Sequence, residues 1–267
     1  MNRISRLFAG NGAGTLRKKV LSAYIIPGFP NAGVTVGMLA AAERAGVDLV
    51  ELGVPFSDPL ADGPVIQRAS QVSIANGTNA LSILRTLREI RRRSELPIIL
   101  MGYFNSFING IGDNFAQEIR DAGADGLIIP DLPLEESGQV KNKIESAGLS
   151  ITFLMAPTST DDRIRKISES SSYFSYCVSV TGVTGVRNNL VSDEVVQFLD
   201  RVRKNSVKPF VVGFGISTPE AAAKISKHSD GVVVGSALVQ QILDAPAGEE
   251  ADYAFRFLGT LRAAIDR

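Results

Sequence analysis

Three acidic residues that stand close together are the first candidates for chemistry in this sequence. Glu51 lies inside the apolar run VDLVELGV, and Asp58 and Asp62 follow in the segment VPFSDPLADGP. A carboxyl group in an apolar strand is either hydrogen-bonded or kept neutral by a raised pKa, and both states suit a general acid or base. The alternative for Glu51 is a structural acid that binds a backbone turn.

The two aspartates also have an ordinary structural explanation. Asp58 precedes a proline and Asp62 precedes a glycine, and both pairs are typical of turns. For Asp58, the turn and a functional role are equally good explanations. Asp62 lies on a segment rich in proline and glycine, which could close over a substrate bound at Glu51. The spacing alone leaves both alternatives open for Asp62.

These acids need strands to position them, and the chain supplies eight short apolar runs. Helix-like segments separate most of the runs, and such alternation predicts a parallel sheet. Eight units in 267 residues predict an α/β fold, a single-domain (β/α)8 TIM barrel over 1–267. The sequence after the first run, PGFPNAG, lacks the G-x-G-x-x-G pattern of an open dinucleotide-binding sheet. The runs are 22–28, 49–55, 97–103, 126–133, 150–157, 174–182, 209–215 and 231–237.

The predicted barrel has additional helices at its ends and two long connections. We expect an N-terminal helix at about 1–18, a C-terminal helix at about 250–267, and long loops after strands 2 and 6. Long loops in a barrel are usually functional, because the active site lies at the C-terminal ends of the strands.

Alternation along the second strand places Glu51 inside this barrel. Leu49, Glu51 and Gly53 share one face of the strand, and Val50 and Leu52 share the other. Valine and leucine suit the apolar layer against the helices. Glu51 is therefore expected to point into the barrel near its C-terminal mouth.

Glycine-rich segments at the end of the predicted barrel indicate a phosphate site. GFGIS (213–217) follows the seventh strand and VVGSA (233–237) ends the eighth. In barrels, the loops after these strands often bind phosphate through backbone N–H groups and a helix N-terminus. Gly215, Gly235 and Ser236 would let a phosphate approach the main chain closely. A phosphorylated small molecule is therefore the expected substrate.

Composition argues against several other classes of protein. The chain has 28 basic and 28 acidic residues, and a net charge of zero does not favour nucleic acid or an anionic membrane. No apolar run approaches the roughly 20 residues of a membrane span, and the N-terminus has no apolar signal-peptide core. The single cysteine, Cys177, cannot form an internal disulfide. We therefore expect a cytoplasmic protein.

The predicted strand ends lack the lysine and the histidines that two kinds of aldolase would need. A Schiff-base aldolase needs a lysine at a strand end, but Lys18, Lys19 and Lys208 precede strands and the other lysines fall in helix-like segments. A metal-dependent aldolase would collect several histidines, and the only one, His228, precedes the eighth strand. The expected chemistry is acid/base work by carboxylates, with no metal and no cofactor.

The segment VELGVPFSDPLADGP resembles the signature of the tryptophan synthase alpha subunit family. PIILMGYFN, GLIIPDLPLEES, SYCVSVTGVTGVR, GFGIS and VVVGSA are similar to further segments of that family, in its order. The resemblance implies a lyase of the carbon–oxygen or carbon–carbon class in tryptophan biosynthesis. Its reaction would be the retro-aldol cleavage of indole-3-glycerol phosphate to indole and glyceraldehyde 3-phosphate, without a cofactor in this subunit.

The resemblance also implies roles for individual residues. Glu51 would protonate the indole ring at C3, and Asp62 would engage the indole N–H. This fits the chemistry, because cleavage of the carbon–carbon bond needs a ring protonated at C3 and a charge that supports the cation. Tyr176 matches a tyrosine beside the glutamate, although a packed aromatic side chain explains this residue almost as well. The implied pocket residues are Tyr24, Tyr103 and Phe214, and the implied phosphate contacts are Gly185, Gly215, Gly235 and Ser236.

The partner implied by the resemblance is a pyridoxal-phosphate β subunit that receives indole through a tunnel in an α2β2 heterotetramer. Asp58, Pro59 and the loop around Asn105 would face this partner. The chain has Asn105–Ser106 where many members have Asn-Pro, which bears on that surface. It also has Gly28–Phe29–Pro30 where many members have Gly-Asp-Pro.

Three alternatives belong to other classes. The first is a free-standing lyase that releases indole without a β subunit. The second is another phosphate-binding barrel enzyme, which should show a lysine or histidine at a strand end. The third is a non-catalytic subunit, which would be expected to have lost Glu51 or Asp62, and the chain has both.

Overall fold

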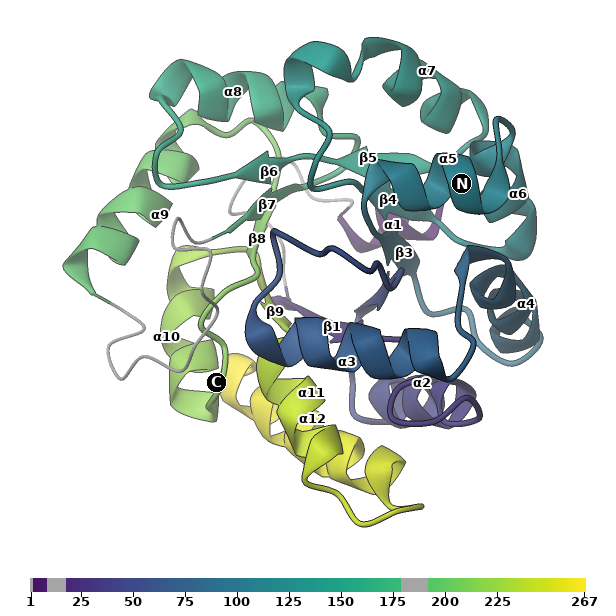
Figure 1. Ribbon diagram of the computed structural model, residues 1–267. Coiled ribbons are helices and arrows are strands. Elements are labelled where there is room, and N and C mark those ends of the chain that lie inside the picture. The colour runs from purple at the N-terminus through teal and green to yellow at the C-terminus, as the bar shows by residue number, and fades with distance from the viewer. Residues whose placement is uncertain (1, 9–17, 179–191) are drawn as a thin grey trace.

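The computed structural model describes residues 2–8, 18–178 and 192–267 and shows a barrel of parallel strands surrounded by helices (Figure 1). Each strand overlaps one of the eight apolar runs in the sequence. The strands are β1 (Val20–Ile25), β2 (Leu49–Gly53), β3 (Ile98–Met101), β4 (Gly126–Ile128), β5 (Ser150–Thr152), β6 (Leu154–Met155), β7 (Ser175–Cys177), β8 (Phe210–Val212) and β9 (Gly231–Val234).

The barrel closes because β5 and β6 are two parts of one strand. The hydrogen-bonded order is β5-β4-β3-β2-β1-β9-β8-β7-β6, and the neighbours are parallel. A single residue, Phe153, separates β5 from β6, and its carbonyl accepts the N–H of Tyr176 at 3.2 Å. Counted as one strand, β5 and β6 give the eight strands of a TIM barrel, which confirms the predicted fold.

Helices cover the outside of the barrel, and the connection after β2 contains two of them. A loop at 54–63, hereafter the 54–63 loop, leads from β2 into the first of these helices. In the described ranges, no helix is long and apolar enough to cross a bilayer. The helices are α1 (Arg3–Leu7), α2 (Thr35–Arg44), α3 (Pro64–Ala75), α4 (Ala80–Arg91), α5 (Phe104–Ile111), α6 (Phe115–Ala122), the 3-10 helix η1 (Leu134–Glu136), α7 (Gly138–Ser146), α8 (Asp161–Ser170), α9 (Asp193–Asn205), α10 (Pro219–His228), α11 (Ser236–Leu243) and α12 (Glu250–Ile265).

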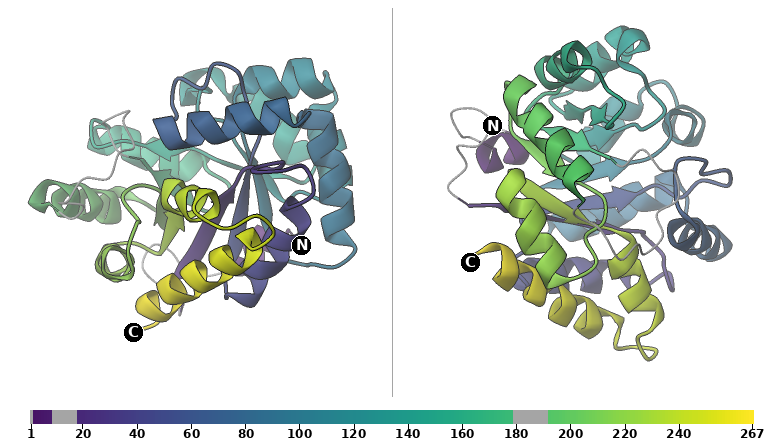
Figure 2. Two further views of the ribbon diagram at one scale, coloured as in Figure 1. Left: turned by 60° about the horizontal axis from the view of Figure 1, so that its bottom comes forward. Right: turned by 90° about the vertical axis from the view of Figure 1, so that its left-hand side faces the viewer.

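The N-terminal helix is shorter than the expected 1–18. Helix α1 ends at Leu7, and Phe8 leaves it to stack on Phe174, with 4.4 Å between the ring centroids. Residues 9–17 lie outside the described part of the chain. Ile4 and Phe8 pack with the side chains inside the barrel, so α1 covers the N-terminal end. Figure 2 (right) shows α1 and the 54–63 loop on opposite sides of the strands.

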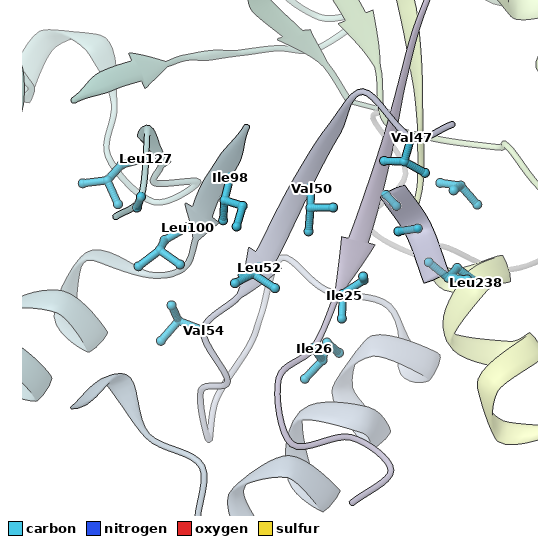
Figure 3. Close-up of a cluster of buried hydrophobic side chains, with 14 of the residues drawn as sticks. Ile25, Ile26, Val47, Val50, Leu52, Val54, Ile98, Leu100, Leu127 and Leu238 are labelled. Atoms are coloured by element: carbon cyan, nitrogen blue, oxygen red, sulfur yellow. The ribbon is translucent and has the colours of Figure 1, made fainter. Parts of the chain in front are cut away.

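The two faces of β2 are buried in two different layers. Val50 and Leu52 belong to the layer between strands and helices, where Figure 3 shows them near Ile98 and Leu100 of β3. Leu49 belongs instead to the layer inside the barrel. The alternation of side chains predicted for this strand is therefore confirmed.

Three aspartates anchor the N-terminal end of the barrel. Asp48, Asp125 and Asp230 each stand directly before a strand and accept a backbone N–H from the strand before it. The N–H donors are Leu21, Ile98 and Phe210, and the paired guanidinium groups are those of Arg262, Arg91 and Arg203. This end is closed by structural contacts, so the C-terminal end remains available for chemistry.

Candidate active site

Glu51 lies on β2 inside the barrel and is fully buried. Its carboxyl Oε1 accepts a hydrogen bond from Ser22 Oγ on β1 at 2.8 Å. The other oxygen, Oε2, accepts from the Tyr176 hydroxyl on β7 at 3.4 Å. Contacts with strands on two sides show that the side chain points into the barrel, as the alternation predicts. These two partners are hydroxyl groups and not the backbone turn of the structural alternative.

Burial governs the acidity of Glu51. Loss of water raises the pKa of this carboxyl to about 7, and the hydrogen bonds from Ser22 and Tyr176 oppose the rise only in part. A group with a pKa near neutrality is populated in both forms at physiological pH. Glu51 can therefore donate a proton and take one back, which is what a general acid and base must do.

Asp62 lies in the 54–63 loop and is held by Tyr103. The Tyr103 hydroxyl lies 3.4 Å from Asp62 Oδ2 and accepts the N–H of Ala61 at 2.8 Å. The ring of Phe56 stacks on the ring of Tyr103, with 5.1 Å between centroids. Burial raises the pKa of Asp62 to about 6, and the hydrogen bond to Tyr103 lowers it. This aspartate thus has contacts beyond those of an ordinary turn.

Asp58, in contrast, is an exposed residue of the same loop. It accepts a hydrogen bond from the neighbouring Ser57 Oγ at 2.6 Å, and its carbonyl accepts the N–H of Leu60 at 2.9 Å. These are local turn contacts. The structure favours the turn explanation for Asp58 and separates it from Glu51.

Tyr24 and Tyr176 are both close enough to Glu51 and Asp62 to feel their negative charges. Burial raises the pKa of both tyrosines, and the negative charges of Glu51 and Asp62 raise each of them further. Both carboxyls therefore act on the same pair of phenols at the C-terminal end of the barrel. The phenols stay protonated at neutral pH and can serve as hydrogen-bond donors.

Two glycines make room for these tyrosines. A Cβ atom on Gly53 would overlap the Tyr24 hydroxyl, and one on Gly213 would overlap the Tyr176 hydroxyl. Neither glycine was identified from the sequence. The available signal was their position, because each stands at or directly after the end of a strand.

The glycine-rich segments lie after β8 and β9, as the sequence predicts. Gly235 immediately precedes α11, and a Cβ atom there would lie 3.6 Å from Cβ of Tyr24. Ser236 is the first residue of that helix, whose initial N–H groups lack partners within the helix. Gly215 has a φ of +72°, which favours glycine, and the partly buried Phe214 packs against the core. The fourth predicted phosphate contact, Gly185, lies outside the described residues.

His228 and Cys177 do not belong to the group of residues around Glu51 and Asp62. His228 ends α10, and its Nδ1 lies 3.5 Å from Asp200 Oδ1. Cys177 is buried, and burial raises the pKa of its thiol. Across the described residues, no group of three or more histidine, cysteine, aspartate or glutamate side chains is placed to hold a metal.

The raised pKa of Glu51 has a consequence for stability. The folded state keeps this proton up to about pH 7, whereas the unfolded chain loses it near 4.5. The folded state binds more protons between these values, so the free energy of unfolding must fall as pH rises from about 4.5 to about 7. Relative to Glu51→Gln, we expect the wild type to lose up to about 3 kcal/mol over this range.

Urea denaturation at several pH values between 4.5 and 8 measures this difference. Glu89→Gln, at an exposed position on α4, is the matched control and should keep the pH dependence of the wild type. Parallel pH profiles for wild type and Glu51→Gln would show that the Glu51 carboxyl has an ordinary pKa in the folded state.

Known proteins are similar to this chain over nearly its whole length. A family model described as tryptophan synthase alpha chain matches residues 13–259. The tryptophan synthase alpha chain of Geotalea daltonii is 46% identical, with 99% of each chain covered, and that of Dehalococcoides mccartyi is 42% identical, with 100% of each covered. A crystal structure of tryptophan synthase subunit alpha from Legionella pneumophila has a TM-score of 0.89 and 36% identity, and covers 100% of this chain and 99% of that one. The chain therefore belongs to the tryptophan synthase alpha chain family.

Proposed function

We propose that this protein cleaves indole-3-glycerol phosphate by a retro-aldol reaction to indole and glyceraldehyde 3-phosphate. The family is one of lyases, and the observation that carries the specific reaction is the buried carboxyl of Glu51. Its pKa of about 7 suits a group that gives and recovers a proton in one cycle. Asp62, a second carboxyl on the mouth of the barrel, supplies the charge that the reaction also needs.

The proposed cycle begins with Glu51 protonated. Glu51 donates its proton to C3 of the indole ring, and Asp62 accepts the indole N–H and stabilises the positive charge on the ring nitrogen. The bond between C3 and the glycerol side chain then breaks, and its electron pair returns to the ring to give indole. The adjacent hydroxyl loses its proton to the Glu51 carboxylate and becomes the aldehyde carbonyl. Glu51 ends the cycle protonated, as it began.

Aromatic side chains around the carboxyls suit a flat apolar ring. Tyr24 and Tyr176 lie near Glu51, and Tyr103 near Asp62. Phe214 follows β8 on the same end of the barrel. We assign these four residues to the substrate pocket, with Tyr176 also bound to Glu51. The proton transfers described above require no cofactor.

The phosphate group is assigned to the segments after β8 and β9. Gly235 immediately precedes α11 and Ser236 begins it, and the positive end of a helix dipole attracts a phosphate to free N–H groups. Gly215 supplies a backbone conformation that other residues rarely adopt. Gly185 completes the proposed contacts from the sequence resemblance alone.

A β subunit is the proposed partner, because the relatives are named as the alpha chain of tryptophan synthase, which implies a further chain. The 54–63 loop offers an apolar contact for it, since the side chain of Leu60 is 90% exposed while its neighbour Pro59 is buried. The loop also carries Asp62, so docking there could act on the active site. The names of the relatives do not favour the free-standing lyase.

The carboxyl variants test the proposed roles directly. Glu51→Gln removes the proton donor and acceptor, so we expect indole formation to fall by about 10²–10⁴-fold or more.

Asp62→Asn removes the charge that supports the cation, and we expect near-normal KM with most of kcat lost. A spectroscopic assay of indole release measures both, with Asp58→Asn as the matched control on the same loop. Retention of more than about a tenth of the activity would remove the residue concerned from the mechanism.

Gly235→Asp tests the phosphate site. A carboxylate at the start of α11 would repel the phosphate and occupy its space, so we expect KM to rise at least about tenfold. Gly138→Asp is a matched control, because Gly138 likewise lies at the N-terminus of a helix and a Cβ there meets nothing within 4 Å. Equal KM values for the two variants would show that the phosphate binds elsewhere.

The partner proposal is tested by substitution at Leu60. We expect the chain to co-elute with a β subunit from a related bacterium, and Leu60→Asp to weaken that binding by about tenfold or more, because a buried apolar contact is replaced by a charge. Val207→Asp is the control, since Val207 is also exposed (51%) but lies before β8, at the opposite end of the strands from the 54–63 loop. Absence of any complex with wild type, together with full indole-releasing activity, would support the free-standing lyase instead.

A further inference from the structure

Ser22 is a buried residue of β1 whose hydroxyl contacts the proposed acid/base group. It is fully buried, and it pairs in register with Leu49 of β2 and Val233 of β9. Both neighbours are apolar and pack inside the barrel. The Ser22 hydroxyl therefore lies among apolar side chains, nearer than Glu51 to the N-terminal end of the barrel. It donates a hydrogen bond to Glu51 Oε1 at 2.8 Å.

The two oxygens of Glu51 are held unequally. The bond from Ser22 to Oε1 has the usual length of an O–H···O hydrogen bond, whereas the 3.4 Å from the Tyr176 hydroxyl to Oε2 exceeds that range. Because Oε1 has a short bond to a donor deeper in the barrel, Oε2 is the oxygen with the greater freedom to exchange a proton.

We propose that Ser22 is a positioning residue for the acid/base step: its hydroxyl fixes Oε1 of Glu51, stabilises the carboxylate form, and leaves Oε2 to exchange the proton with substrate. This inference rests on the proposed role of Glu51. After Glu51 has donated its proton and before it takes one back, its carboxylate is charged and shielded from water. Burial disfavours this state. A charge-assisted hydrogen bond from Ser22 offsets part of that cost.

Other titratable groups lie around Glu51 and could titrate in the same pH range. The protonation of Glu51 must therefore be measured from a signal of its own carboxyl group. Tyr24 stands opposite it on β1, Tyr176 reaches it from β7, and Asp62 acts on the same tyrosines from the 54–63 loop. The neighbouring strand β3 places Ile99 beside it. Burial and the nearby carboxyls raise the pKa of both tyrosines, whereas Asp62, with a pKa of about 6, titrates close to Glu51.

The first test is a carbon-13 NMR titration of protein labelled at the glutamate side-chain carboxyl. The signal of Glu51 is identified by its loss in Glu51→Gln. In Ser22→Ala, we expect the midpoint of the Glu51 titration to move upward by about one pH unit, because the carboxylate loses a donor. Ser150→Ala is the matched control: Ser150 is a buried serine on β5 that donates to the Asp125 carbonyl, and its loss should leave the midpoint unchanged.

The second test is the pH dependence of indole formation. The cycle starts from protonated Glu51, so in Ser22→Ala the alkaline limb of kcat/KM should move upward by the same amount as the NMR midpoint. The plateau of kcat should fall by up to about tenfold, because the carboxylate intermediate is less stable, and KM should change little. Ser22→Thr keeps the hydroxyl and should restore both midpoint and rate.

The outcomes separate this proposal from the proposed function. An unmoved NMR midpoint in Ser22→Ala, with Glu51→Gln inactive, would overturn the role of Ser22 and leave that of Glu51. A moved midpoint without a moved rate profile would also overturn it, because Ser22 would then be only a structural partner. An active Glu51→Gln would overturn the proposed function, and the role of Ser22 with it.

Discussion

A carboxyl group inside a barrel of apolar side chains has lost its water, and this loss of solvation raises the pKa of Glu51 to about 7. The surrounding structure determines how far the pKa rises. Ser22 and Tyr176 donate to the two oxygens and favour the charged form, yet neither carries a positive charge. A cation at the same distance would hold the carboxyl ionised at neutral pH and remove its capacity to act as an acid.

The second carboxyl is held in a different way. Glu51 stands on a strand whose register with β1 and β3 fixes it, whereas Asp62 depends on contacts between the 54–63 loop and Tyr103. The Tyr103 hydroxyl accepts the N–H of Ala61 while it faces Asp62, and burial raises its pKa to about 12, so it keeps its proton as a donor. One group is thus preorganised by the barrel, and the other is placed by a loop that a ligand or partner could reach.

Periodicity and residue type were sufficient to predict much of this arrangement. Alternation along β2 predicted that Val50 and Leu52 face the helices and that Glu51 faces inward, and eight apolar runs predicted the barrel. Ser22 could not be identified from the sequence, because its contact with Glu51 depends on the register between β1 and β2, which the periodicity within each strand does not give. The end of α1 at Leu7 was also missed, since Phe8 turns away to meet Phe174, a contact between the two halves of the chain.

The partners of the buried acids distinguish structural from chemical roles. Asp125 and Asp230 are almost as buried as Glu51, but each accepts a backbone N–H and pairs with an arginine at the N-terminal end of the barrel. An acid held by a cation and by the main chain fixes strands in place. Glu51 has hydroxyl partners and lies toward the other end, where its charge can change without breaking an ion pair. The same barrel can therefore be anchored by its acids at one end and do proton chemistry with an acid at the other.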